Sequence, residues 1–415
     1  MAKKSKFKNL IIFSIVFSLI TLTGCTTYDN FKDSFKNEKD QEKKNVLYIG
    51  VYEPASGIYR NEGLDEIAGI ELANSIYTNV RGYDIELIKV DNKSEAKSSK
   101  EAMKTLIDKK PIGIIGSKGE ASSLIATSIC EKNRIPLITP SSTNYLVTGS
   151  NKYCFRTSLT TSQMGIGLSD YIKNNKKIKR IGTISVLGDN SAKNFEASFI
   201  KTIKKDKDKR DNLTKYEIDV KKQNYKKVFK AIKKDKPEAI LLSGDTKTCD
   251  KIFSGIEKNN MTDILFLGKN NFGEEDFLKM MKKHPKIKIA FAQDGVNYES
   301  FYLNKKKSIE TEKFMTEMSN RYGNTDRANQ GIALGYDSYL IMINAIKKAK
   351  NIDSESVRQA LSETKNLKCA TGIFSFDSNG DPTRSVNIMT IKNGTIEPIY
   401  VANANKSIQT IKIKK

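Results

Sequence analysis

Short apolar runs alternate with amphipathic stretches along most of this chain. Apolar or strand-like runs at 46–51, 83–90 and 111–115 are separated by segments with helical spacing at 63–76 and 94–108. Strands of a parallel sheet read as continuous apolar runs because helices cover both faces of the sheet. The pattern therefore predicts an α/β lobe built on a doubly wound parallel sheet.

The alternation resumes after residue 180, which predicts a second lobe of the same kind. Strand-like runs lie at 180–186, 216–220, 239–242 and 264–267. The helices between them are expected around residues 195–203, 228–232 and 252–256. Open α/β sheets bind ligands beyond the carboxyl ends of their strands, so two such lobes facing one another would form a cleft lined by strand-to-helix loops.

The N-terminus predicts export. Lysines at positions 3, 4, 6 and 8 precede an apolar run at 10–20 and the sequence LTGC at 22–25. An apolar run of about a dozen residues is too short to remain as a membrane-spanning helix. The segment resembles the bacterial lipobox, in which the cysteine becomes the lipidated first residue of the mature protein. We expect a signal peptide over 1–24, lipid on Cys25 and a flexible, polar tether over 25–45; an ordinary cleaved signal with an incidental cysteine is the alternative.

The net charge of +23 does not by itself indicate nucleic-acid binding. The lysines are spread along the chain among acidic residues, and no nucleic-acid-binding motif stands among them. A solvated basic surface is therefore expected, with attraction to an anionic wall or membrane as a further possibility. The lysine-rich, tryptophan-free composition and the lipobox are typical of the surface of a low-GC Gram-positive bacterium.

Neither catalysis nor metal binding is indicated. Apart from the leader cysteine, Cys130, Cys154, Cys249 and Cys369 are widely spaced, form no C-x-x-C motif and have no nearby histidine, which argues against zinc. Export permits disulfides, but the sequence does not choose among the three pairings of four cysteines, nor between pairing and reduced, buried thiols. His284 is the one histidine and lies in a lysine-rich segment, a poor base for a hydrolase. We expect no enzyme, cofactor or metal.

Two loops of the first lobe carry polar groups suited to a ligand. GSKGEASS at 116–123 follows the run at 111–115, and PSSTN at 140–144 follows the next expected strand at 136–139. Both place hydroxyls and free backbone N–H groups at the start of a helix, where the helix dipole favours an anion such as a carboxylate. Serine and threonine are also ordinary helix N-caps, so the same residues have a purely structural interpretation.

Several segments resemble one known family in their order and spacing. They are DN at 91–92, IIG at 114–116, RIPLITPSSTN at 134–144, CFRT at 154–157, GYDSY at 335–339 and ATGIFSFDSNGD at 370–381. The resemblance is to the branched-chain amino-acid (Leu/Ile/Val) binding proteins of ABC transporters, which have the type I periplasmic-binding-protein fold, and it runs from about residue 46 to 398.

The resemblance implies two lobes joined by a hinge that the chain crosses three times. Lobe 1 would comprise 46–157 with 297–368, and lobe 2 would comprise 158–296 with 369–415. The lobes would close around the ligand by hinge bending. The implied partners are a small amino-acid-like ligand and the permease and ATPase subunits of an ABC importer, with the receptor a monomer that binds no nucleic acid.

The family's ligand contacts can be carried over only in part. The family holds the ligand's carboxylate and ammonium with loop residues that match Ser117, Ser122, Ser141, Ser142 and Thr143 here. Tyr52, Glu53 and Tyr59, expected in a nearby loop, are further candidates. The sequence departs from the family at Glu120 and Asp245, and it has Lys269, Asn270 and Asn271 where an acid is expected. Glu120 or Asp245 could supply the carboxylate that a buried ammonium needs, or Lys269 could meet a second acid group on the ligand. Exposed helix-cap acids are the alternative interpretation of Glu120 and Asp245.

Together these observations favour a lipid-anchored, extracytoplasmic solute-binding receptor of an ABC importer for an amino acid or a related small polar ligand. Two alternatives stay open. One is a sensory module of the same fold that signals to a membrane or regulatory partner. The other is a surface protein that has kept the fold and lost its ligand, because fold alone does not fix function.

Overall fold

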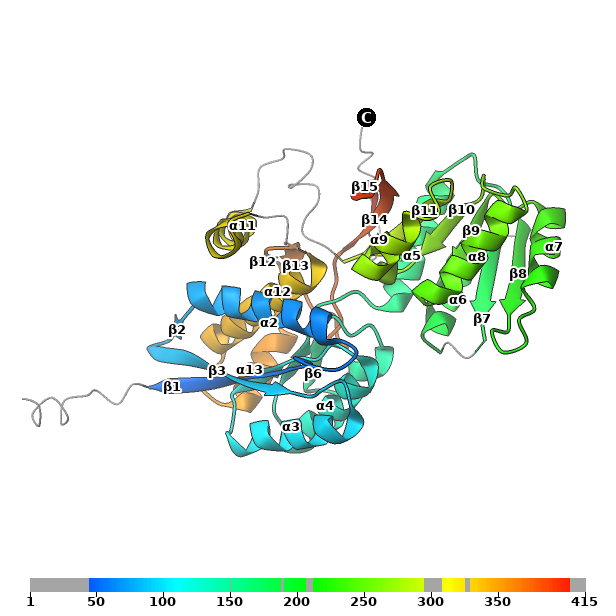
Figure 1. Ribbon diagram of the computed structural model, residues 1–415. Coiled ribbons are helices and arrows are strands. Elements are labelled where there is room, and N and C mark those ends of the chain that lie inside the picture. The colour runs from blue at the N-terminus through cyan, green and yellow to red at the C-terminus, as the bar shows by residue number, and fades with distance from the viewer. Residues whose placement is uncertain are drawn as a thin grey trace, which may run out of the picture. The chain divides into compact units, whose positions relative to one another are not determined.

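The computed structural model describes residues 45–149, 151–187, 190–206, 212–294, 308–324 and 329–403 (Figure 1). The predicted signal peptide and the predicted lipidation site at Cys25 lie outside these residues. Within the described part of the chain, no helix combines the length and the apolar character needed to cross a membrane. The described elements form two α/β lobes, as the alternation predicts.

The first lobe is built on a six-stranded sheet with the order β2-β3-β1-β4-β5-β6. Pairing is parallel from β1 through β4 and β5 to β6. Successive residues face opposite sides of the sheet, so Val51 packs in one core and Tyr52 in the other. The strands are β1 (Val46–Glu53), β2 (Asn79–Val80), β3 (Tyr83–Asp91), β4 (Gly113–Ile115), β5 (Leu137–Thr139) and β6 (Cys154–Arg156).

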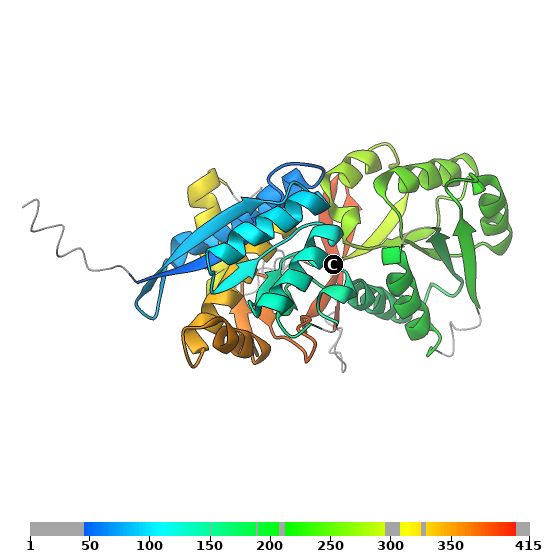
Figure 2. The ribbon, with the colours of Figure 1, turned by 90° about the horizontal axis from the view of Figure 1, so that it is seen from below.

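Helices cover both faces of this sheet, which makes it doubly wound (Figures 1 and 2). The helices that pack on one face are α2 (Arg60–Ile76), α11 (Ile309–Tyr322), α12 (Gln330–Lys348) and α13 (Ser354–Ser362); those on the other are α3 (Ala96–Asp108) and α4 (Glu120–Asn133). Helices α2 and α12 touch at backbone distance. A Cβ on Gly69 would lie 1.9 Å from the Ile332 carbonyl oxygen, and one on Gly335 would lie 2.2 Å from that of Glu66. Glycine is therefore required at both crossing points.

The second lobe is built on a seven-stranded sheet with the order β15-β14-β11-β10-β9-β7-β8. The strands from β11 to β8 are parallel, whereas β14 is antiparallel to β11 and to β15. The predicted parallel sheet is confirmed with this addition of an antiparallel C-terminal hairpin. The strands are β7 (Ile181–Val186), β8 (Leu213–Ile218), β9 (Ala239–Leu242), β10 (Leu265–Gly268), β11 (Lys288–Gln293), β14 (Ser385–Lys392) and β15 (Thr395–Asn403).

Helices also cover both faces of the second sheet. One core contains side chains of α5 (Thr161–Asn174) and α6 (Asn190–Ile203), and the other contains those of α7 (Tyr225–Asp235), α8 (Thr246–Lys258) and α9 (Glu275–Met281). Helix α5 begins with a complete capping box, in which Thr160 and Gln163 each bond to the other's backbone N–H. That cap fixes the start of the first helix after β6.

A short hairpin, β12 (Leu367–Cys369) and β13 (Gly372–Phe374), precedes the C-terminal strands. Cys369, Phe374 and the following Phe376 pack in the core of the first lobe. The buried Asp337 of α12 holds the turn of the hairpin, accepting hydrogen bonds from the backbone N–H of Ala370 at 2.8 Å and of Thr371 at 3.2 Å. The points at which the chain passes between lobes stay a prediction.

The four cysteines outside the leader are free thiols, and all are buried. Cys130 and Cys154 lie in one core of the first lobe, Cys369 lies in the other, and Cys249 lies in the second lobe. Burial raises the pKa of each thiol above its usual range. Of the two states that the sequence leaves open, the structure shows reduced, buried cysteines.

Candidate functional site

The carboxyl ends of three neighbouring strands bring the predicted ligand loops together. Strands β1, β4 and β5 are adjacent and parallel, so their last residues lie at one edge of the first sheet. Glu53 ends β1, and the loops 116–119 and 140–144 follow β4 and β5. The Lys118 backbone N–H donates to Glu53 Oε2 at 2.8 Å, which ties the first loop to the end of β1.

Three of the predicted ligand residues have side chains that face the protein interior. Tyr52 is fully buried, and its hydroxyl donates to the Ser122 carbonyl at 3.3 Å. Ser122 Oγ lies 2.9 Å from Ser99 Oγ, and Ser117 Oγ accepts a 2.7 Å hydrogen bond from the Asn92 amide. These bonds hold the 116–119 loop and the first turn of α4 in place. The side-chain hydroxyls of Tyr52, Ser117 and Ser122 are therefore already hydrogen-bonded within the lobe.

Glu120 and Asp245, the two acids expected as candidates for an ammonium, are both exposed. Glu120 is the first residue of α4 and accepts a hydrogen bond from the Asn144 amide. Asp245 caps α8, accepting the Thr248 backbone N–H at 2.7 Å. The structure thus gives each acid a local structural partner, as the helix-cap interpretation expects, and the role of either acid toward a ligand stays a prediction.

The loop after β5 presents its hydroxyls differently. Ser141 donates from Oγ to Glu66, whereas Ser142 Oγ is buried and has no hydrogen-bond partner among the described residues. Thr143 is half-buried. The Ser142 carbonyl accepts hydrogen bonds from the Arg156 guanidinium and from Ser158 Oγ, both at 3.0 Å. Ser142 is thus held by its backbone while its hydroxyl stays unused.

Arg156 is a supporting residue that sequence reasoning did not identify. Its side chain is fully buried, and besides Ser142 it binds Thr148 Oγ1 and Asp381 Oδ1, each at 2.7 Å. One guanidinium therefore connects both ends of the 142–148 segment to the turn that contains Asp381. An arginine inside a short apolar strand is the sequence signal that could have revealed it, because buried arginine requires several acceptors.

Two buried carboxyls, Glu53 and Glu66, form a pair at this edge. The sequence suggests Glu53 as a candidate contact, but sequence reasoning did not identify Glu66 or the pairing. They are 0% and 1% exposed, and they hydrogen-bond to one another. No described N–H or O–H group donates to Glu53 Oε1 or Glu66 Oε2. Two buried carboxyls that contact one another favour holding one proton between them over carrying two charges. Burial raises the pKa of both carboxyls, and the charge of Glu66 raises that of Glu53 further, while the Lys118 ammonium opposes the rise at both.

A sequence signal for Glu66 does exist. Gly63, Ile70 and Ala73 lie on the buried face of α2, and Glu66 falls at helical spacing on that same face. An acid on the apolar face of a helix that covers a sheet must find a partner, because an unpaired buried charge is costly. The partner, Glu53, lies just after the apolar run at 46–51 and is the last residue of β1.

The carboxyl edge of the second sheet also carries buried polar atoms without partners. Ser243 Oγ, Asn271 Oδ1 and Gln293 Oε1 lack a hydrogen-bond donor or acceptor among the described residues. Ser243 follows β9, Asn271 follows β10, and Gln293 is the last residue of β11. These three strands are parallel neighbours in the sheet. The Asn271 amide donates to the Gly244 carbonyl at 3.0 Å, and the predicted ligand residue Asn270 is half-buried beside it.

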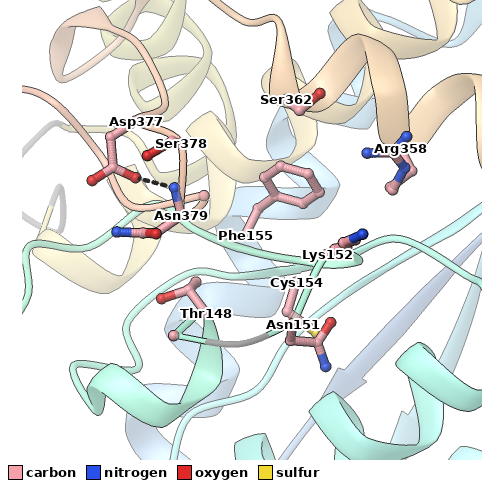
Figure 3. Close-up of a pocket in the computed structure, with 12 residues that line it drawn as sticks. Thr148, Asn151, Lys152, Cys154, Phe155, Arg358, Ser362, Asp377, Ser378 and Asn379 are labelled. Carbon is pink, nitrogen blue, oxygen red and sulfur yellow. Dashed lines mark hydrogen bonds between the residues drawn. The ribbon is translucent and has the colours of Figure 1, made fainter.

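A cavity of about 300 Å³ lies elsewhere in the first lobe (Figure 3). Thr148, Asn151, Phe155 and Arg358 contribute to its wall, together with the turn at 377–380. The Asp377 carboxylate is occupied in that turn, accepting the Asn379 backbone N–H at 2.8 Å. No predicted ligand residue lines this cavity. Among the described residues, moreover, no cluster of histidine, cysteine and acidic side chains could hold a metal ion.

The chain is similar to known binding proteins over most of its length. Residues 46–395 match the family model described as periplasmic binding protein. A leucine binding protein, LivK, from Thermotoga maritima is 24% identical, with a TM-score of 0.71, and the match covers 86% of this chain and 99% of that chain. LivJ from Streptococcus pneumoniae, a branched-chain amino acid transporter substrate binding protein solved in complex with isoleucine, is 22% identical with a TM-score of 0.69 and covers 86% and 99% of the two chains.

Two further proteins are similar to the chain. A solute binding protein of an ABC transporter from R. palustris, solved in complex with benzoate, is 18% identical with a TM-score of 0.67, and the match covers 88% of this chain and 99% of that chain. A curated Pseudomonas aeruginosa protein described as an amino acid binding protein is 32% identical over 143 residues, which are 33% of this chain. The chain thus matches only 38% of the length of that curated relative.

Proposed function

Because the chain belongs to the periplasmic binding protein family, we propose that it is an extracytoplasmic solute-binding receptor of an ABC importer. It binds an amino acid or a related small polar ligand between its lobes and performs no chemistry on that ligand. The predicted lipid on Cys25 holds it at the outer face of the cell membrane, in a Gram-positive cell by its composition. It works as a monomer and delivers its ligand to permease and ATPase subunits.

The observation that carries this proposal is the set of unpartnered buried polar atoms at the carboxyl edges of both sheets. Among the described residues, Ser142 supplies one such atom in the first lobe, and Ser243 and Asn271 supply two in the second. A buried polar group without a partner costs about 1–3 kcal/mol. A polar ligand that meets these atoms removes that cost, so their position at the edges where α/β sheets bind ligands favours a receptor.

The ligand class follows from the groups that surround the first-lobe edge. Leucine, isoleucine and benzoate, named for the similar structures, all carry a carboxylate. The hydroxyls of Ser142 and Thr143 and the free N–H groups where α4 begins suit such an anion. We therefore place a carboxylate of the ligand at the 116–120 and 141–143 loops.

The hinge belongs to the same proposal. The proposed lobes are 46–157 with 297–368, to whose core residues 369–376 contribute, and 158–296 with the C-terminal strands. Closure around the ligand then changes the shape that the importer recognises. A ligand can shift this equilibrium only by its difference in affinity for the open and closed states.

A pair of substitutions tests the site without disturbing the fold. In Ser142→Ala and Ser243→Ala, each change removes a buried hydroxyl that has no partner, so the stability of the ligand-free protein should hold or rise slightly. If the hydroxyls bind the ligand, each change should weaken binding about ten- to a hundredfold, the value of one hydrogen bond to a charged group. Thermal unfolding and calorimetric titration of the soluble form that begins at Thr26 measure both quantities.

The chain offers a matched control in Thr127. Its Oγ1 is likewise buried and has no partner among the described residues, but it lies in the third turn of α4, away from the carboxyl ends of the strands. Thr127→Val should leave affinity unchanged. The ligand screen covers L-leucine, L-isoleucine, benzoate, other amino acids and short peptides. A ligand at 100 times its Kd raises the unfolding free energy of the protein by about 2.7 kcal/mol. A folded protein that no compound stabilises, or equal losses of affinity in all three variants, would overturn the proposed function.

A further inference from the structure

We propose that the Glu53–Glu66 carboxyl pair is the subsite for a cationic group of the ligand, and that a ligand ammonium replaces the proton that the pair shares. This inference rests on the proposed function and adds to it the chemistry of one subsite. It assigns the acid that an ammonium requires to the first lobe, at residues that the family resemblance does not indicate.

The geometry places the pair where the predicted ligand loops meet. Glu53 closes β1, and its Oε2 accepts the Lys118 N–H of the loop after β4. Glu66 accepts a hydrogen bond from Ser141 of the loop after β5. Glu53 Oε1 lies against Gly116, since a Cβ on that glycine would come within 3.1 Å of it. The pair therefore borders both loops that are proposed to bind the ligand's carboxylate.

A second observation separates the pair from an ordinary acidic cluster. Ser142, which follows the serine bonded to Glu66, is 5% exposed, and its hydroxyl has no partner among the described residues. Glu53 Oε1 and Glu66 Oε2 have none beyond one another. Ser142 Oγ thus lacks a donor, and the two carboxyl oxygens have only the proton that they share. An ammonium has three N–H donors, so it can replace that proton and also donate to the hydroxyl oxygen.

The charges around the pair allow the exchange. Lys118 acts on both carboxyls as a cation, and Asp65 of α2 acts on Glu66 as a like charge. Lys118 also forms an ion pair with Glu274 at 3.5 Å, and the charge of Glu62 acts on it as well. Helix α12, which packs on α2, contributes a neutral group here, because the Asn329 amide donates to Asp65 at 2.6 Å. With one shared proton, Glu53, Glu66, Lys118 and Glu274 together carry a net charge of −1. When a ligand R–NH₃⁺ enters and H⁺ leaves, this sum does not change.

The exchange makes binding depend on pH. Over the range in which the free pair holds its proton, the affinity for an ammonium-bearing ligand should rise up to tenfold per pH unit, because one proton is released for each ligand bound. Above that range the affinity should become constant. A ligand without an ammonium should show no such rise.

The test uses L-leucine and 4-methylpentanoate, which has the same carbon skeleton without the ammonium. Calorimetric titration in phosphate and in Tris, whose ionisation enthalpies differ, measures proton release directly. We expect L-leucine to bind more tightly than 4-methylpentanoate and to release up to one proton. Glu66→Gln should remove the proton release and weaken L-leucine at least tenfold, with little effect on 4-methylpentanoate. Glutamine has the shape of the protonated acid, so the fold should persist, and Glu53→Gln provides an independent second variant.

Glu71→Gln on the same helix is the matched control. Glu71 pairs with the exposed Lys89, so this substitution should leave both affinities unchanged. Equal affinity of the wild-type protein for the two compounds, or L-leucine binding without proton release, would overturn the subsite and leave the receptor function standing. Absence of binding by every compound in the wider screen would overturn the receptor function and this inference with it.

Discussion

Arg156 provides the sharpest test of how the candidate site is supported. Its guanidinium lies 2.7 Å from Asp381 Oδ1, 3.0 Å from the Ser142 carbonyl and 2.7 Å from Thr148 Oγ1. Arg156→Met keeps the length and apolar stem of the side chain and removes all three bonds. The Ser142 carbonyl and the Thr148 hydroxyl would then lose donors inside the lobe.

The expected cost follows from the burial of each partner. Breaking a buried ion pair by removing one member costs about 3–5 kcal/mol, chiefly because the other charge is left unpaired in the interior. The Arg156 side chain is 0% exposed, but that of Asp381 is 18% exposed, so water can reach the carboxylate that stays behind. We therefore expect a loss near the lower limit, about 3 kcal/mol of unfolding free energy.

Urea unfolding followed by far-UV circular dichroism measures this loss, since the chain has no tryptophan to report by fluorescence. Arg134→Met is the matched control in the same lobe. Arg134 also binds a carboxylate, that of Glu355, but its side chain is 73% exposed, and exposed pairs contribute little. If Arg156→Met shifts the urea midpoint no more than Arg134→Met, the buried guanidinium does not support the loop and the reasoning is refuted.

Three further outcomes are expected. The raised pKa of Glu53 means that the folded protein holds the proton of this carboxyl more tightly than the unfolded chain does. The protonated carboxyl therefore contributes to stability at acid pH, and this contribution is lost as the pH rises through the folded pKa. Glu53→Gln should lose less stability than wild type between about pH 5 and pH 8 in thermal unfolding. Gly335→Ala should reduce the unfolding free energy by more than about 1 kcal/mol in urea, because its Cβ would meet the Glu66 carbonyl at 2.2 Å, and an unchanged midpoint would contradict the close helix contact. His284→Ala should cost about 2–4 kcal/mol in the same assay, because its buried ring bonds to Glu257 at 2.8 Å and to Asp250 at 2.9 Å; a cost below 1 kcal/mol would show that these bonds add nothing.

The fold could be predicted because its signal is periodic and local. Apolar runs such as 46–51 and 239–242 form buried parallel strands, and the amphipathic segments between them form helices on both sheet faces. The antiparallel hairpin of β14 and β15 was not predicted in the same way. Its pairing joins β14 to β11 across about ninety residues of chain, and the sequence of a strand does not identify the distant strand with which it pairs.

The candidate site could be predicted only at the level of its backbone. The loops after β4 and β5 lie at one edge because parallel strands align their carboxyl ends, which needs no knowledge of side-chain packing. Whether a given hydroxyl faces the ligand or the interior depends on packing that sequence does not encode locally. Ser117 and Ser122 therefore bond within the lobe, whereas the neighbouring candidate Ser142 keeps its hydroxyl unpartnered.

Core packing and site chemistry meet at Glu66. Gly69 and Gly335 let α2 and α12 approach until backbone meets backbone, and Gly335 does so against Glu66 itself. This contact fixes the backbone of Glu66, so its side chain reaches Glu53 and Ser141 at the carboxyl edge of the sheet. The buried acid is thus positioned by the same glycines that stabilise the lobe. A chain that kept the apolar pattern of α2 but replaced those glycines would retain the composition of the site and lose its geometry, because a shift of even 1 Å separates hydrogen-bonded atoms.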